Sequence, residues 1–241
     1  MKINTYFSGS SGNLSKLSDG HTEILFDCGV SMLNIKKALN FELTRIKATL
    51  ITHEHKDHSK GVNSFVERGM TCISSAGTFE ALGIDSPFAI GLNKKDDGEY
   101  PSINIGTLII KPFAIVHDAV EPVGFFVYSK ITKERVVYLT DTGAIPVRFN
   151  NLNYLMIEIN YSLEEIQKRY LGDEVVFALY KKVRRTHLEE SQVLDYLKSI
   201  NLAYLKELHI LHRSQGNSGD TDVLKKKLLD IIPRKTKLFL T

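Results

Sequence analysis

The sequence predicts an α/β fold in which two β-sheets pack together and are covered by helices. Three observations predict it: strand-like apolar segments dominate the first half, helices with one apolar stripe mark the second half, and the order of strands followed by helices occurs twice. No Pro- or Gly-rich linker separates the halves. We therefore expect one domain over residues 1–241, which agrees with the chain length of 241 residues.

The first half and the middle of the chain are predicted to be rich in strands, with short helices between them. Short apolar segments bounded by clusters of turn-forming residues indicate strands, and the Gly/Ser/Asn cluster at residues 8–13 separates the first two. Strands are predicted at residues 2–7, 14–18, 22–28, 48–52, 71–75, 103–116, 123–129 and 135–139, and helices at residues 31–39, 60–68 and 77–83.

Three helices are predicted in the second half. The apolar stripe of residues 187–200 consists of Val193, Leu194, Leu197 and Ile200, and that of residues 222–232 consists of Leu224, Leu228, Ile231 and Ile232. A shorter helix is predicted over residues 163–169. Buried strands are predicted at residues 153–159, 205–211 and 237–240.

The composition is that of an ordinary globular protein, with 43% hydrophobic and 24% charged residues. The formal net charge of +3 is too small to predict or to exclude a nucleic-acid-binding surface. Two cysteines, Cys28 and Cys72, exclude a disulfide scaffold and favour a reducing compartment. Neither a secretory signal nor a stretch of about 18 apolar residues is visible, so we expect a cytoplasmic protein without a membrane partner.

The pattern His-x-His-x-Asp-His at residues 53–58 predicts a metal site. Residues two apart point in different directions on a helix, but they share one face of a strand. The apolar segment 48–52 supplies that strand, and a turn after it brings His58 beside Asp57. His53 and His55 can therefore ligate one metal, while Asp57 and His58 ligate a second.

Further ligands are expected just past strand ends, at His117, Asp141 and His212. His53, His55 and His117 would then hold one metal, Asp57, His58 and His212 the other, and Asp141 would bridge them. His209 competes with His212, but only one of the two can point into the site, and the loop position favours His212. A donor set of imidazoles and carboxylates suits two zinc ions, with manganese or iron as the alternative. Asp27 is expected to hold a ligand histidine or the motif loop, and Cys28 to be buried rather than a ligand.

These residues resemble the signature of the metallo-β-lactamase superfamily, which is His-x-His-x-Asp-His followed by a His, an Asp and a final His. The similarity is strongest to its WalJ/YycJ-type subfamily, in the motifs SGSSGN at 8–13, ILFDCG at 24–29, HDAVEPVGF at 117–125, LTDTG at 139–143 and MIEIN at 156–160. The resemblance implies an αββα sandwich. The C-terminal third also resembles tRNase Z, which implies roles for Glu158, His187 and His212.

The candidate catalytic residues are Asp57, His187 and Glu158. His187 is expected at the start of a helix, where it could protonate a leaving alkoxide while Glu158 orients it. Cations and helix N-terminal N–H groups nearby favour a phosphate. The candidate substrate-binding residues are Ser11, Asn13, Arg184, Arg185, Ser214 and Asn217. For the basic run 181–185, a phosphate site and a solvated helix face are equally compatible with the sequence.

The site predicts a dinuclear metal-dependent phosphodiesterase, and the resemblance implies a nucleic-acid substrate cut by a 5′–3′ DNA exonuclease. The first alternative is hydrolysis of a cyclic nucleotide, as in the phage anti-Pycsar enzymes. Further alternatives are a lactonase or thioesterase and a metal-stabilised binding protein. Aromatic and basic residues are not interleaved along the sequence, and this absence weakens the case for a long DNA-binding surface. The resemblance also leaves a homodimer open.

Overall fold

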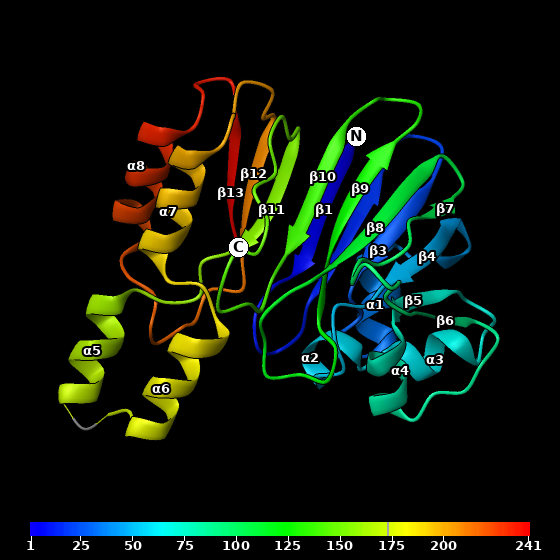
Figure 1. The fold of residues 1–241 in the computed structure, drawn as a ribbon, viewed down its shortest axis with the longest axis horizontal. Coiled ribbons are helices and arrows are strands. Elements are labelled where there is room, and N and C mark those ends of the chain that lie inside the picture. The colour runs from blue at the N-terminus through cyan, green and yellow to red at the C-terminus, as the bar shows by residue number, and fades with distance from the viewer. Residues whose placement is uncertain (173) are drawn as a thin grey trace. The chain divides into compact units, whose positions relative to one another are not determined.

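The computed structural model describes residues 1–172 and 174–241, drawn in Figure 1. Its elements form two compact units, residues 1–114 with 119–134, and residues 115–118 with 135–241. The single domain expected over residues 1–241 stays a prediction.

The first unit contains a six-stranded mixed sheet and a three-stranded antiparallel one. The six strands lie in chain order: β1 (Lys2–Phe7), β2 (Leu14–Ser18), β3 (Glu23–Phe26), β4 (Ile46–Leu50), β5 (Cys72–Ser75) and β6 (Ala89–Leu92). The neighbours β1–β2 and β2–β3 are antiparallel. The neighbours β3–β4, β4–β5 and β5–β6 are parallel. The second group is β7 (Ile103–Ile105), β8 (Leu108–Ala114) and β9 (Val123–Ser129). Phe26 and Phe125, whose ring centroids are 6.5 Å apart, bring the two groups into contact.

Short helices cover the outer face of the six-stranded sheet. They are α1 (Met32–Ala38), the 3₁₀ turn η1 (Leu43–Arg45), α2 (Lys56–Ser59), α3 (Val62–Val66) and α4 (Ala76–Leu82). Figure 1 shows α1, α3 and α4 gathered beside β4, β5 and β6. Ile35, Phe65 and Phe79 lie in one buried cluster with residues of the sheet, so apolar burial fixes these helices against it.

The helix predicted over residues 60–68 is α3, which spans only Val62–Val66, and a separate short helix, α2, precedes it at Lys56–Ser59. The backbone N–H of Gly61 donates to the carbonyl of Cys28 at 2.8 Å. A Cβ at Gly61 would come within 3.0 Å of that carbonyl oxygen. This tertiary contact, which no local pattern reveals, separates α2 from α3.

The second unit contains four parallel strands, β10 (Arg135–Leu139), β11 (Tyr154–Glu158), β12 (Glu207–Leu211) and β13 (Lys237–Leu240). The residues of β11 are all buried and those of β10 and β12 nearly so, as expected for parallel strands covered on both faces. The unit's helices are α5 (Leu163–Leu171), α6 (Phe177–Thr186), α7 (Glu190–Ser199) and α8 (Thr221–Ile231). Because the strands are parallel, the residues that follow β10, β11 and β12 meet at one edge of the sheet.

Helix α6 was not predicted from the sequence, and the helix predicted to start at residue 187 starts at Glu190. Helix α6 is mostly exposed, and of its ten residues only Val183 and Thr186 are buried. His187 is the C-cap of α6, and the N-cap of α7 is Glu189. The prediction that His187 lies at a helix N-terminus is therefore wrong.

Among the described residues, none of the helices combines the length and apolar character needed to cross a membrane.

Candidate metal centre

In the first unit, the motif loop packs three histidine rings together. Strand β4 ends at Leu50, and His53 follows it, completely buried. The ring centroid of His53 lies 4.6 Å from that of His55 and 4.3 Å from that of His58. His55 is the N-cap of α2, so Asp57 and His58 lie in the first turn of that helix rather than on an extended strand. The Oγ of Ser59 donates to the carbonyls of residues 54 and 55 and holds this turn.

Asp27 fixes the orientation of His58. Its side chain is completely buried, and its Oδ2 accepts a hydrogen bond from Nδ1 of His58 at 2.8 Å. Its Oδ1 accepts from the backbone N–H and the hydroxyl of Thr52 at 2.9 and 3.0 Å. Because a carboxylate only accepts, His58 carries its proton on Nδ1, which leaves Nε2 as the possible ligand atom.

The turn at residues 12–13 and the segment 27–29 pack against the motif loop at the backbone of Asp57. The N–H and the Nδ2 of Asn13 donate to the carbonyl of Asp57, and Nδ2 lies 3.0 Å from Nε2 of His58. A Cβ at Gly29 would lie 1.6 Å from the carbonyl oxygen of Asp57, so only glycine permits this approach. Asn13 is buried in these contacts, whereas Ser11 is exposed.

In the second unit, Asp141 and His212 meet at the carboxyl edge of the parallel sheet. Oδ1 of Asp141 lies 3.2 Å from Nδ1 of His212, and its Oδ2 lies 3.9 Å from Nε2 of His117. Asp141 and His212 follow β10 and β12 with φ of 51° and 50°. A left-handed backbone is unfavourable for such residues, by about 1–3 kcal/mol, and is found where the surroundings fix a functional side chain.

Glu158 lies behind this pair and holds His187. It is completely buried, and its Oε2 accepts from Nδ1 of His187 at 3.0 Å. Its Oε1 accepts from the backbone N–H of Thr142 at 2.6 Å and from that of Leu188 at 3.3 Å. Burial alone would raise the pKa of Glu158, but the charge and hydrogen bond of His187, together with a hydrogen bond from His212, lower this pKa. Burial likewise opposes protonation of His187, yet Glu158 raises the pKa of His187. A charged pair with a proton on His187 is therefore favoured.

His117 is positioned by the end of α6. Its Nδ1 donates to the carbonyl of Thr186 at 3.0 Å. Burial lowers the pKa of His117 in spite of the nearby Asp141, so the ring is neutral at pH 7 and presents Nε2 as a ligand atom. The loop of Gly143 passes so close that a Cβ there would lie 1.8 Å from the carbonyl oxygen of Arg185. This close approach explains the glycine of the LTDTG motif.

Several supporting residues were missed by the sequence analysis. Nδ2 of Asn160 donates to the carbonyl of His212 at 3.0 Å and lies 3.1 Å from Nδ1 of its ring. The hydroxyl of Thr142 accepts from the backbone N–H of Val116. Thr52 bridges Asp27 and the motif histidines. Each lies within or next to a recognised motif, and that adjacency was the available signal.

The predicted substrate-binding residues of the second unit lie in two places. Asn217 is buried, and its Oδ1 accepts from Nη1 of Arg169 at 2.6 Å. The backbone N–H of Ser214 donates to the carbonyl of Asn160 at 2.9 Å. These two residues thus shape the loop after His212, whereas Arg184 and Arg185 are exposed on α6.

His209 points away from the cluster, in agreement with the choice of His212. Its Nε2 lies 3.0 Å from Oε2 of Glu207, and its ring stacks on Phe239 with 4.4 Å between centroids.

The donors in both units suit a divalent metal ion. Ligand atoms of Asp141, Glu158, His187 and His212 all lie within 4.8 Å of one another. Imidazole and carboxylate donors without a thiolate match zinc or manganese. Cys28 and Cys72 are buried in the apolar cluster of the first unit, and burial raises the pKa of both thiols, so neither supplies a thiolate.

A family model described as a beta-lactamase superfamily domain matches residues 22–210. The exodeoxyribonuclease WalJ of Streptococcus pneumoniae (serotype 2, strain D39) is 32% identical over 177 residues. This alignment covers 68% of the chain and 64% of WalJ, so the chain spans just under two thirds of the length of this relative.

Two solved structures share the fold. The metallo-β-lactamase fold protein YhfI of Bacillus subtilis has a TM-score of 0.71 at 15% identity, covering 99% of this chain and 95% of that one. The short form of human tRNase Z has a TM-score of 0.67 at 15% identity, covering 100% and 96%. The predicted fold class, two mixed β-sheets flanked by helices, is thereby confirmed. Because the family model matches residues 22–210, which are most of the chain, the chain belongs to the metallo-β-lactamase superfamily of hydrolases.

Proposed function

We propose that this protein is a divalent-metal-dependent phosphodiesterase that cleaves nucleic acid. The observation that carries the proposal is the buried Glu158 with His187 at 3.0 Å, beside Asp141 and His212. A thioester releases a weakly basic thiolate that needs little help from an acid, whereas an alkoxide leaving from phosphorus needs a proton.

Two divalent ions would be held by the seven residues that the sequence predicts. His53, His55 and His117 would hold one ion, Asp57, His58 and His212 would hold the other, and Asp141 would contribute to both. Such ions lower the pKa of a bound water and polarise the phosphoryl group.

The protein's own residues orient the histidine side chains of the site and protonate the leaving group. Asp27 holds Nδ1 of His58, and Nε2 on the other side of the ring lies 3.5 Å from Oδ2 of Asp57. Glu158 contacts His187 rather than substrate, so it is a positioning residue. His187 donates its proton to the leaving oxygen of the diester. Zinc is the proposed metal, with manganese as the alternative.

For the substrate we propose DNA, degraded from the 5′ end. Support comes from the similarity to WalJ, which is named an exodeoxyribonuclease. The cytoplasmic location and the homodimer expected from the sequence stay predictions.

A hydrolysis panel tests the proposal. Protein loaded with zinc or manganese is given bis-p-nitrophenyl phosphate, 5′-labelled single- and double-stranded DNA, and 3′,5′-cyclic nucleotides. The variants are His55→Ala and His187→Ala, with His21→Ala, an exposed histidine, as the matched control. Release of label from DNA that is lost in the first two variants and kept in the control is expected.

The other outcomes distinguish the alternatives. Turnover of cyclic nucleotides with DNA left intact would replace the nuclease by a cyclic-nucleotide phosphodiesterase. Absence of any phosphodiester cleavage with both metals would overturn the proposal, and lactones and thioesters would be assayed next. A metal-induced rise in melting temperature without turnover of any substrate would indicate a binding protein.

A further inference from the structure

Helix α6 presents an unusual concentration of positive charge. Four of its ten residues are basic, Lys181, Lys182, Arg184 and Arg185, and none is acidic. All four are exposed. Lys182 pairs with Asp118 at 3.1 Å, and Nη1 of Arg184 donates to the hydroxyl of Tyr180. This face of the second unit therefore carries excess positive charge.

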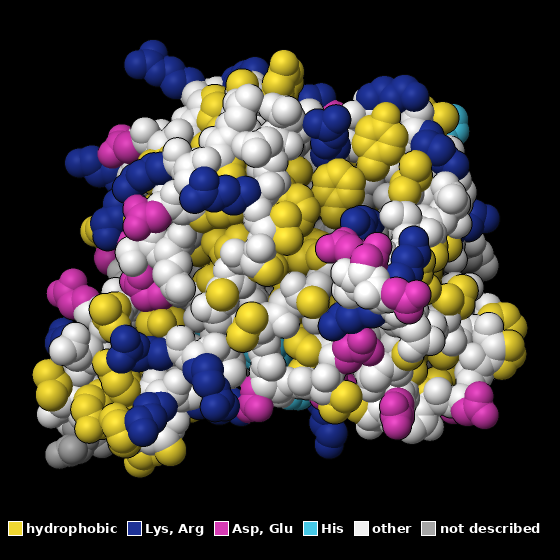
Figure 2. Space-filling model, in the orientation of Figure 1, with side chains coloured by type: hydrophobic (Ala, Val, Ile, Leu, Met, Phe, Trp, Pro, Cys, Tyr) yellow, Lys and Arg dark blue, Asp and Glu magenta, His cyan; other side chains and the backbone are white. Residues whose placement is uncertain are grey.

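Aromatic rings lie among these cations. The ring centroid of Tyr180 lies 4.8 Å from that of Tyr170 on α5, with 20° between the planes, and Phe177 lies 5.7 Å from Tyr170. Nζ of Lys181 lies 4.2 Å from the ring of Phe177, and the guanidinium of Arg184 lies 5.2 Å from that of Tyr180. Figure 2 shows hydrophobic and basic side chains intermixed over α5 and α6.

The expectation that aromatic and basic residues do not interleave is therefore wrong for this surface. Each cation follows its aromatic partner by four residues, which places both on one face of a helix. Tyr170 joins them from α5 through the packing of the two helices, which the sequence does not show.

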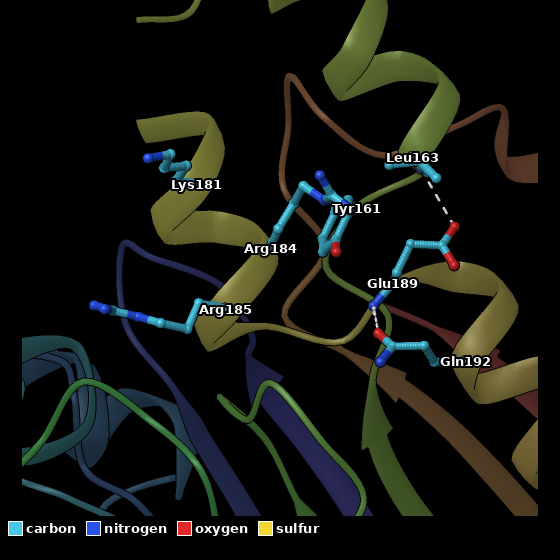
Figure 3. Close-up of a pocket in the computed structure, with 7 residues that line it drawn as sticks. All are labelled: Tyr161, Leu163, Lys181, Arg184, Arg185, Glu189 and Gln192. Atoms are coloured by element: carbon cyan, nitrogen blue, oxygen red, sulfur yellow. Dashed lines mark hydrogen bonds between the residues drawn. The ribbon is translucent and has the colours of Figure 1, made fainter. Parts of the chain in front are cut away.

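Two hollows flank α6. One, of about 390 Å³, is lined by Tyr161, Leu163, Lys181, Arg184, Arg185, Glu189 and Gln192. Figure 3 shows Arg184 reaching from α6 toward Tyr161 across it. The second, of about 550 Å³, is lined by Phe177, Ala178, Lys181, Lys182 and Arg185. Because Lys181 and Arg185 line both hollows, one extended ligand can occupy the two by crossing α6 over these side chains.

We propose that this surface, which we call the α6 face (Tyr170, Phe177, Tyr180, Lys181, Arg184 and Arg185), binds single-stranded nucleic acid next to the scissile phosphodiester. The proposal rests on the phosphodiesterase function proposed above. Phosphates contact the cations, and unpaired bases stack on the aromatic rings. Among these rings, Phe177 is half-exposed and offers apolar surface for a base. A duplex keeps its bases stacked inside and cannot use the rings in this way.

The position of α6 explains why binding there would matter for cleavage. The helix ends at Thr186, whose carbonyl accepts from His117, and the next residue is His187. A strand that crosses α6 into the first hollow reaches Arg185 and Glu189, which lie close to His187 in the chain. A protein partner would match the apolar residues alone, whereas a polyanion matches both the rings and the excess of positive charge.

Binding is measured on the metal-loaded protein with a fluorescent phosphorothioate single strand, which resists cleavage, at several salt concentrations. Phe177→Ala is expected to weaken binding by about five-fold or more, since a stacked base is lost. Phe177→Trp should restore it, and Phe41→Ala, which removes another exposed phenylalanine, should leave it unchanged. The double variant K181Q/R185Q should flatten the slope of log Kd against log salt by about 1.4. The matched double variant K225Q/K226Q, which removes two exposed lysines of α8, should keep the slope.

Turnover separates this inference from the proposed function. For Phe177→Ala, the ratio of kcat/KM on single-stranded DNA to that on bis-p-nitrophenyl phosphate should fall at least about five-fold. If the wild-type protein cleaves both substrates and the α6 variants keep the wild-type ratio, affinity and salt slope, the inference is wrong and the function stands. If the wild-type protein neither binds nor cleaves DNA, both are wrong. Equal binding of single strands and duplexes would also overturn the stacking role.

Discussion

Nδ1 of His187 donates a hydrogen bond to Oε2 of Glu158 across 3.0 Å, and the Glu158 side chain is completely buried. Glu158 comes from the end of a parallel strand, whereas His187 caps α6. The tertiary fold thus joins the C-terminal end of α6 to a buried carboxylate at the edge of the sheet.

Removal of this acid is expected to slow chemistry rather than metal binding. His187→Ala should lower kcat on a phosphodiester by about 10²- to 10⁴-fold, the usual contribution of a positioned proton donor. Glu158→Gln should lower kcat less, because the ring remains but loses its charged partner. Bound metal is counted by mass spectrometry in each variant. A parallel loss of metal and activity in His187→Ala would show that this residue is a ligand instead.

Asp27→Asn is expected to weaken metal binding by about ten- to a hundred-fold, since an amide holds Nδ1 of His58 less strongly than a carboxylate does. Competition with a zinc chelator measures the affinity. The control Asp85→Asn removes an exposed carboxylate and should bind metal as the wild type does. Unchanged affinity in Asp27→Asn would mean that Asp27 only supports the fold.

Gly143→Ala should displace the loop that carries Asp141 and thereby lower activity. The new Cβ would lie 1.8 Å from the carbonyl oxygen of Arg185, so the backbone must move. Gly172→Ala is the matched control, because the nearest atom to a Cβ there is 3.4 Å away. Turnover and melting temperature are compared for both variants. Wild-type turnover in Gly143→Ala would show that the loop tolerates the shift.

Asp19 should make the stability of the protein depend on pH. Burial alone would raise the pKa of Asp19, but hydrogen bonds from Thr107, Thr22, Ser129 and the N–H of His21 lower it to about 2. A lowered pKa stabilises the folded protein above the ordinary value of 3.8, and this stabilisation is lost as pH falls toward 2.

The test is urea unfolding of Asp19→Asn beside the wild type. At pH 7 the variant should lose about 1–3 kcal/mol of unfolding free energy, because the amide disturbs several buried hydrogen bonds. The difference should shrink between pH 4 and pH 2. A difference that is constant over this range would exclude the charge of Asp19 as its cause.

The sequence alone determined the elements and residues whose signals are local. His53, His55, Asp57 and His58 are metal-ligand residue types grouped directly after a strand, so the sequence alone predicts a metal site there. Parallel strands such as β11 are continuous apolar runs, and Asp141 and His212 follow such runs. These features depend on neighbours in the chain, and the sequence contains them.

The tertiary structure decided what depends on contacts between distant residues. It turned Asn13 toward the backbone of Asp57 and engaged Asn217 with Arg169. It also placed His187 at the end of α6, a helix that was not predicted from the sequence. Tyr170 joins the rings of α6 only because α5 packs beside it. Hydrogen bonds and stacking between segments far apart in the chain create these arrangements, and no local pattern encodes them.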